Sequence, residues 1–157
     1  MQHLATVESV SARLETVLIR LSGHFRSMSE SRLLGRLPDG RSRAAAGHEL
    51  AGLLALAAQG VEDRVRQVPP AWRALPFEGP FVVGDQIGVT GHDLLVACVC
   101  AGAGGGATPP AADAGVEVWA PVTGPTGDGS GARYERVGIE GLLRRVLAAA
   151  EGLGGVL

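Results

Sequence analysis

The feature that most constrains this chain is an apolar stretch over residues 81–106, which reads FVVGDQIGVTGHDLLVACVCAGAGGG. No proline breaks it, and polar residues do not alternate with apolar ones, so it is too long and too irregular for a strand. Asp85, Gln86, His92 and Asp93 leave only residues 94–103 uninterrupted, about half of the roughly 20 that a bilayer-spanning helix needs. We therefore predict a helix over about 83–102 that does not span a membrane.

This helix is expected to be apolar on two sides. With 3.6 residues per turn, Val89, Val96 and Val99 fall on one face. The other face carries a longer set of residues, namely Val83, Ile87, Gly91, Leu94, Leu95 and Cys98. Because a helix that is apolar all round is normally buried, we predict that this is the central helix of the fold.

Three glycines in the same stretch indicate close packing. Gly84, Gly88 and Gly91 each cost about 1 kcal/mol in helix propensity, which is recovered only where a neighbouring backbone approaches closely. The alternative is a hairpin over VVGDQIGVTG, because its valines and isoleucine favour strands and its glycines could form turns. We rank the hairpin second, because the run HDLLVACVCA continues without a break.

Three further segments have the spacing of amphipathic helices, in which large apolar residues recur every three or four positions. They cover about residues 3–26, 43–67 and 137–153. Ser42 is a suitable N-cap for the second of these helices, Val65 belongs to its inward stripe, and the prolines that follow stop it. The proline-rich link PPAWRALPFEGP should then cross the end of the bundle as an extended strap.

Together these elements predict an all-α fold in one domain over residues 1–157. Four helices joined by two shorter links and one long link are typical of a four-helix up-down-type bundle. A chain of this length can bury about 70% of its unfolded surface, so its core needs no disulfide or metal.

The segment from about 103 to 133 is rich in Gly, Ala, Pro and Thr and poor in large apolar residues. Such a composition does not offset the entropy lost on ordering, so we expect a flexible insertion before the last helix. Within it, GVEVWAPV and ARYERV alternate well enough to pair across a glycine-rich turn, and we leave a short β-hairpin open. Two isolated strands are only marginally stable, so any sheet here is expected to be weak.

The composition argues against nucleic acid as a partner. Fourteen arginines, no lysine and sixteen acidic residues give a net charge of −2, which provides no general attraction for a phosphate backbone. Only six residues are aromatic, so platforms for stacking bases are scarce. The abundance of arginine, alanine, glycine and valine is instead an actinobacterial-like composition, typical of a GC-rich genome.

The two cysteines and the amino terminus indicate a reducing compartment. Cys98 and Cys100 are separated by about 200° on a helix, which disfavours a disulfide between them. Cys98 lies on the inward face, so we expect a small buried hydrophobe with a raised pKa, whereas Cys100 is the more accessible thiol. The first residues, MQHLATVESVSARLE, have neither the apolar core nor the cationic run of a signal peptide, so we expect a cytoplasmic protein.

The best functional lead is a cluster of four arginines in the link before the second long helix. Arg32, Arg36, Arg41 and Arg43 crowd into the segment SMSESRLLGRLPDGRSR, which contains few acidic residues. Such a run is usually a solvated connection. The functional alternative is a binding site for an anion, a phosphate or an acidic partner. We call these four residues the arginine turn.

A second candidate is a polar site on the central helix, formed by Asp85, His92 and Asp93. Asp85 and His92 are seven residues apart on one face, where we expect them to hydrogen-bond to each other or to a neighbour. The phrase VTGHDLLVA, which contains part of this site, resembles a helix of the DinB-like, thiol-dependent metalloenzyme bundles. The resemblance is confined to this phrase and implies a metal-dependent enzyme. The sequence departs from the family pattern at the ligand positions, where Thr90 or Gly88 stands, depending on the alignment.

A zinc site of His24, His48, His92 and Cys98 is not favoured. His48 should project about 150° from the inward stripe of its helix, into solvent, and His92 lies on a different arc from Cys98. We therefore assign no metal ligands.

The sequence contains no nucleophile elbow with a Ser, His and acid arrangement, no dinucleotide fingerprint and no phosphate loop, so we assign no catalytic residue and no cofactor. The function predicted is that of a non-catalytic interaction or regulatory module, which binds an unknown protein partner or a second copy of itself. The alternative is a metal-dependent or small-molecule-binding bundle enzyme of the DinB-like type.

Overall fold

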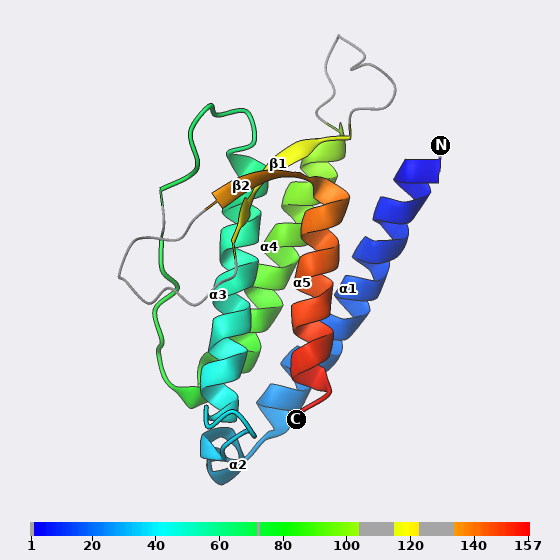
Figure 1. Ribbon diagram of the computed structural model, residues 1–157. Helices are drawn as coiled ribbons and strands as arrows, with labels where there is room; N and C mark the ends of the chain where they lie inside the picture. Colours follow the sequence, from blue (N-terminus) through cyan, green and yellow to red (C-terminus); the bar gives the residue numbers. More distant parts are fainter. Residues whose placement is uncertain (1, 72, 104–114, 123–133) are drawn as a thin grey trace.

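The computed structural model describes residues 2–71, 73–103, 115–122 and 134–157 (Figure 1). These residues are mostly helical, with a small antiparallel sheet of two strands. In chain order the elements are α1 (Gln2–Ser27), α2 (Glu30–Leu34), α3 (Arg43–Glu62), a 3-10 turn (Pro80–Val82), α4 (Val83–Ala103), β1 (Glu117–Pro121), β2 (Tyr134–Gly138) and α5 (Ile139–Gly154).

The four long helices lie side by side, but their directions do not alternate along the chain (Figure 1). α1 and α5 run one way, and α3 and α4 both run the other way. The starts of α3 and α4 meet at Gly47, where an added Cβ would lie 2.6 Å from Cγ1 of Val83. The helical fold is therefore as predicted, whereas the up-down-type order of a four-helix bundle is not confirmed.

The connection between α3 and α4 explains this order. Because the two helices run parallel, residues 63–79 must bring the chain back to the end at which α3 began, and Figure 1 shows them returning along the outside of α3. The prediction that the proline-rich strap crosses the end of the bundle is therefore wrong. The strap instead runs along the length of α3. Leu75 packs against the core from this strap.

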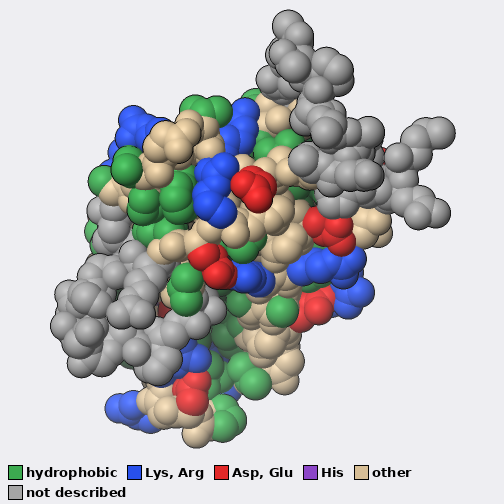
Figure 2. Space-filling view, turned by 45° about the horizontal axis from the view of Figure 1, so that its top comes forward, with side chains coloured by type: hydrophobic (Ala, Val, Ile, Leu, Met, Phe, Trp, Pro, Cys, Tyr) green, Lys and Arg blue, Asp and Glu red, His purple; other side chains and the backbone are tan. Residues whose placement is uncertain are grey.

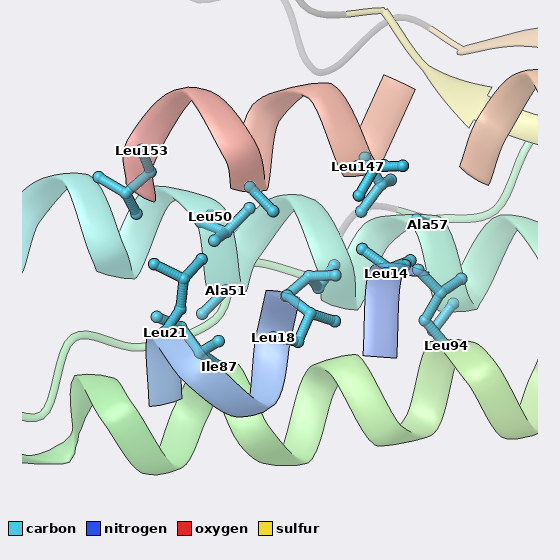
Figure 3. Close-up of a cluster of buried hydrophobic side chains, with 14 of the residues drawn as sticks. Leu14, Leu18, Leu21, Leu50, Ala51, Ala57, Ile87, Leu94, Leu147 and Leu153 are labelled. Atoms are coloured by element: carbon cyan, nitrogen blue, oxygen red, sulfur yellow. The ribbon is translucent and has the colours of Figure 1, made fainter. Parts of the chain in front are cut away.

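The core lies between the four long helices, which all contribute to it (Figure 3). Leu14, Leu54, Leu94 and Leu143, one from each helix, are all fully buried. Two buried polar residues, Ser22 and Thr90, are paired as expected: the Ser22 hydroxyl donates to the Gly84 carbonyl at 2.8 Å, and the Thr90 hydroxyl donates to the Gln86 carbonyl at 2.7 Å. Three other buried side-chain atoms have no hydrogen-bond partner among the described residues, namely Nε of Arg43, Oε1 of Gln59 and the hydroxyl of Tyr134.

α4 is a helix, as predicted, but it is buried on one face only. Val83, Ile87 and Leu94 on the inward face have no exposed surface. Val89 and Val99 on the opposite face are 60% and 71% exposed. The prediction that both apolar faces are covered is therefore wrong, because α4 packs mainly against α1 and α3 and has no neighbour on its third side among the described elements.

The glycines of α4 allow the close packing that the sequence predicted. An added Cβ on Gly84 would lie 2.8 Å from the carbonyl oxygen of Ser22, and one on Gly91 would lie 2.7 Å from Cδ1 of Leu18. A Cβ on Gly88 would lie 3.1 Å from Oγ of Ser22. All three contacts are with Ser22 or Leu18 of α1, and at Gly84, where the contact is with backbone, glycine is required for this approach of α1 to α4.

α3 begins where the sequence predicts and ends earlier. The Ser42 hydroxyl caps it by accepting from the backbone N–H of Ala45. The helix stops at Glu62, five residues before the predicted end at about residue 67, and Val65, expected on the inward stripe, is 80% exposed. The carbonyl groups beyond the helix bind the sheet instead: that of Arg64 accepts from Arg136 at 2.7 Å, and that of Arg66 accepts from the indole N–H of Trp119 at 3.2 Å.

The sheet is more firmly placed than the sequence suggested. β1 and β2 pair antiparallel with Val118 opposite Val137, and the side chains of Val118 and Ala120 are fully buried. β1 packs over α3 at Gly60, where an added Cβ would lie 1.8 Å from the Trp119 carbonyl oxygen. β1 is therefore part of the core, and β2 packs against it through half-buried Val137. The rest of the predicted flexible insertion, residues 104–114 and 123–133, lies outside the described residues.

Replacing Leu94 by alanine tests the buried face of α4. We expect Leu94→Ala to lower the free energy of unfolding by about 2 to 5 kcal/mol in urea denaturation, because a fully buried leucine loses its contacts and leaves a cavity. Val99→Ala is the matched control on the same helix, with an expected change of less than about 0.5 kcal/mol because Val99 is exposed. Equal losses in the two variants would contradict the assignment of these faces.

Replacing Gly60 by alanine tests the contact between β1 and α3. Gly60→Ala should destabilise the protein by about 1 to 3 kcal/mol, because the new methyl group meets backbone that has to move. Gly52→Ala lies in the same helix with no atom within 4 Å of the new Cβ. This control should gain up to about 1 kcal/mol from helix propensity. A neutral Gly60→Ala would show that β1 does not rest on α3.

Candidate functional site

The arginine turn extends from Arg32 in α2 to Arg43 at the start of α3, and an isolated bridge between Arg36 and Ser42 closes the connection between these helices. At its tip the Arg41 guanidinium donates twice to Oδ2 of Asp39, at 2.9 and 2.7 Å, and also pairs with Glu49 at the start of α3. The hydrogen bonds from Arg41 lower the pKa of Asp39 below its ordinary value. Arg41 is thus held between two carboxylates of its own chain.

Two of the other arginines bind backbone carbonyl groups nearby. Arg36 donates to the carbonyl of Gly40, whose positive φ of 88° forms the turn. Half-buried Arg43 donates to the carbonyl of Arg32 at 3.4 Å, which joins α3 to the end of α2. Arg32 itself is exposed. The structure therefore brings the four arginines to one end of the molecule, and three of the guanidinium groups help to hold the turn together.

A hollow of about 400 Å³ adjoins this turn, between α3 and α5. Asp39, Arg41 and Glu49 supply its charged rim. Its apolar wall is formed mainly by Leu37, Leu50, Leu53, Leu153 and Val156. A volume of this size is in the range of small-molecule sites, but the charged groups on its rim already pair with one another.

The polar residues of α4 do not converge on one point. Asp85 accepts from Nε of Arg26 in α1 at 2.6 Å, which agrees with the predicted pairing to a neighbour. His92 lies about two turns further along the same face and lines a hollow of about 270 Å³ between α1 and α4. Asp93 is exposed and points about 100° away from His92.

No metal cluster is found in the described part of the chain, where no group of three or more His, Cys, Asp or Glu side chains is placed to hold an ion. Cys98 is buried, and burial raises its pKa to about 12, as expected for a structural thiol. Cys100 is exposed.

His48 is not in the solvent, where its helical phase predicted it. Its Nδ1 lies 3.0 Å from Oε1 of Gln86, and its ring meets that of Phe77 edge-on at 5.1 Å. Gln86 in turn donates to the carbonyl of Pro76 at 2.8 Å. The prediction failed because the strap returns along this side of α3, and His48 then fastens the strap to the start of α4.

The surface feature that stands out is a row of exposed apolar side chains on α4. Val89, Val96 and Val99 are 60%, 45% and 71% exposed. Across the hollow that His92 lines, α1 contributes Ile19, which is 68% exposed. We call these four residues the α1/α4 face. The three valines belong to the apolar residues predicted for this helix, whereas Ile19 was not predicted as a site residue. Its exposure follows from its position on the polar side of α1, next to buried Leu18.

The face shown in Figure 2 has a different character. Basic and acidic side chains lie next to one another over it, and hydrophobic side chains are scattered among them. Ion pairs at the strands join Arg136 to Glu117 and Arg145 to Glu135. A surface of interspersed charges is typical of solvent-facing regions.

One described helix, Pro80–Gly102, is long and apolar enough to cross a membrane by length and composition alone. In its most apolar window, 44% of the residues are buried inside the protein. Asp85, His92 and Asp93 all lie on its exposed side.

The low pKa of Asp39 gives a test of the arginine turn. Because the folded-state pKa lies below the unfolded one, the stabilising effect of this carboxylate is present above the unfolded value and is lost as the pH falls through the folded value. Arg41→Ala should raise the pKa of Asp39 toward its ordinary value of about 3.9, as measured by carboxyl ¹³C NMR titration. Arg36→Ala, which removes a bond to a carbonyl group only, should leave that pKa unchanged. An Asp39 pKa that stays low in Arg41→Ala would contradict the assigned cause.

Comparison with known proteins finds no matching protein-family model, curated protein or solved structure. The α1/α4 face is separate from the arginine turn, whereas the turn and the hollow beside it share Arg41.

Proposed function

We propose that this protein is a non-catalytic interaction module and that the α1/α4 face is its contact surface. The observation that carries the proposal is the exposure of Val89, Val96 and Val99 along one side of α4. Single exposed apolar residues are common and need no explanation, whereas an aligned group on one face is typical of a binding surface.

The spacing of these valines makes them one continuous surface. Val89 and Val96 are seven residues apart and Val99 follows three residues later, so all three project from the same side of the helix. Covering apolar surface contributes about 25 cal/mol for each Å² removed from water, so a partner on this face stabilises α4 in the way that α1 and α3 do on its other sides.

The polar residues on the same side favour a protein partner over the lipid interior. Asp85, His92 and Asp93 are exposed on α4 among the valines. Ionisable groups are costly in hydrocarbon, whereas a protein interface accommodates them at its polar rim.

The other two hypotheses have less support. An anionic partner at the arginine turn would have to displace Asp39 and Glu49 from Arg41, or rely on the remaining arginines, two of which bind carbonyl groups. A metal-dependent enzyme of the DinB-like type is favoured by no arrangement of ligands within the described ranges.

The test compares three tagged baits in affinity capture, both from lysate of the native organism and from a solution of the untagged chain. The baits are the wild type, the double variant Val89→Glu with Val99→Glu, and the control Val65→Glu. Val65 is 80% exposed and lies outside the α1/α4 face. Val65→Glu therefore makes the same chemical change at an exposed position away from that face.

We expect the wild type and the control to retain the same bound protein and the double variant to lose it, with unchanged circular dichroism in all three. The reason is that a buried, unpaired carboxylate at an interface is strongly unfavourable. Equal capture by all three baits, or no capture of any protein by the wild type, overturns the proposal.

A further inference from the structure

We infer that the partner of the α1/α4 face is a second copy of this chain, packed across a two-fold axis with the two α4 helices antiparallel. This inference rests on the proposed function and names the occupant of the same surface. Three features of the face support it: the order of its valines, the distribution of its charges, and its size together with the hollow that it contains.

The valines are arranged so that the face matches itself. A two-fold axis places the same patch of each copy against the other, so that residue i of one opposes residue j of its partner and the reverse. We place the axis perpendicular to α4, at the midpoint between His92 and Asp93. Val89 of each copy then lies opposite Val96 of the other. The interface then contains two equivalent contacts between Val89 and Val96, which cover both valines of each copy.

The same axis aligns opposite charges on α1. Leu18 lies beside Gly91 and Ser22 beside Gly88, so the axis crosses α1 at about the level of Val17. Arg26 of each copy then lies opposite Glu8 of the other. Glu8 is exposed and, within the described part of the chain, has no ion-pair partner, while Arg26 keeps 54% of its side chain exposed despite its pair with Asp85. The exposed part of the Arg26 guanidinium in each copy then lies near the Glu8 carboxylate of the other, which fits an antiparallel pair.

The hollow between α1 and α4 accepts an apolar side chain from the partner. It has a volume of about 270 Å³ and is lined by Leu18, Ile19, His92 and Leu95 among others. Ile19 lies about two residues from the level of the axis, so the axis places the Ile19 of each copy level with Glu15 of the other, at one edge of the hollow. This side chain, 68% exposed in the single chain, is thereby covered.

The size of the face is sufficient for a reversible dimer. From Phe81 to Val99 the α4 side extends about 27 Å, and two adjacent helices are roughly 20 Å wide. The footprint is therefore on the order of 500 Å² for each copy, or about 1,000 Å² in total, which is at the lower limit for a specific interface. We therefore expect dimers that dissociate on dilution.

Sedimentation equilibrium over a range of concentrations is the first test. The wild type and Val65→Glu should shift from monomer to dimer as the concentration rises. The double variant Val89→Glu with Val99→Glu should weaken the dimer by at least about a hundredfold, while its circular dichroism stays that of the wild type. A wild type that stays monomeric at all concentrations, or equal association of the three proteins, overturns the inference.

Cross-linking tests the antiparallel arrangement, in a Cys100→Ser background that removes the exposed native thiol. Val89→Cys and Val96→Cys are prepared separately, and a short bismaleimide is added to each alone and to their mixture. An antiparallel pair gives a covalent heterodimer in the mixture and little product from either variant alone. Efficient cross-linking of each variant alone, or an equal yield when Val65→Cys replaces one of them, overturns this arrangement.

The two experiments also separate this inference from the proposed function. A monomeric chain whose α1/α4 face still captures another protein overturns the second copy as partner and leaves the interaction module standing. A monomeric chain that captures nothing overturns both.

Discussion

The close approach of α1 to α4 is the contact on which the rest of the structure depends. Gly84, Gly88 and Gly91 remove the side chains that would hold the helices apart, and the Ser22 hydroxyl donates to the Gly84 carbonyl in the space this leaves. Because α4 turns its small residues toward α1, its large ones, such as Ile87 and Leu94, point into the core. The glycines therefore lower the helix propensity of α4 and fix its rotation at the same time. That rotation is also what leaves its valines in solvent.

A second constraint is the parallel course of α3 and α4. It requires a long return connection, and the strap lies along α3 and is fastened to α4 through His48, Gln86 and the Pro76 carbonyl. The sheet uses the other exposed side of α3, where Gly60 admits the backbone of β1. Both additions cover α3, whereas neither covers the outer side of α4. This difference between the two helices explains why no described element covers the α1/α4 face.

Rules that act over a few neighbouring residues predicted the helices of this fold well. The predictions that failed depend on contacts between residues that are distant in the sequence. Periodicity located the four long helices, and the Ser42 cap followed from a side-chain preference that acts over three residues. Val65 was misplaced because the end of α3 is decided by β1, which is distant in sequence. His48 was misplaced for the same reason, since the strap lies where helical phase alone suggests solvent. Among the candidate site residues, Asp85 has the predicted neighbouring partner, but the pairing of Arg41 with both Asp39 and Glu49 could not be foreseen from composition.

The exposed side of α4 shows what apolar periodicity does and does not measure. The pattern predicts how much of a helix is removed from water. It does not predict whether the elements that cover the helix belong to the same chain. Among the described elements, α4 packs mainly against α1 and α3, and the exposed valines show that part of its circumference is left uncovered. Val89, Val96 and Val99 occupy the remaining arc together with the charged and polar groups expected at an interface. Because no described element of this chain covers that arc, we propose that its third neighbour comes from another molecule. A second copy meets this requirement with the chain's own residues.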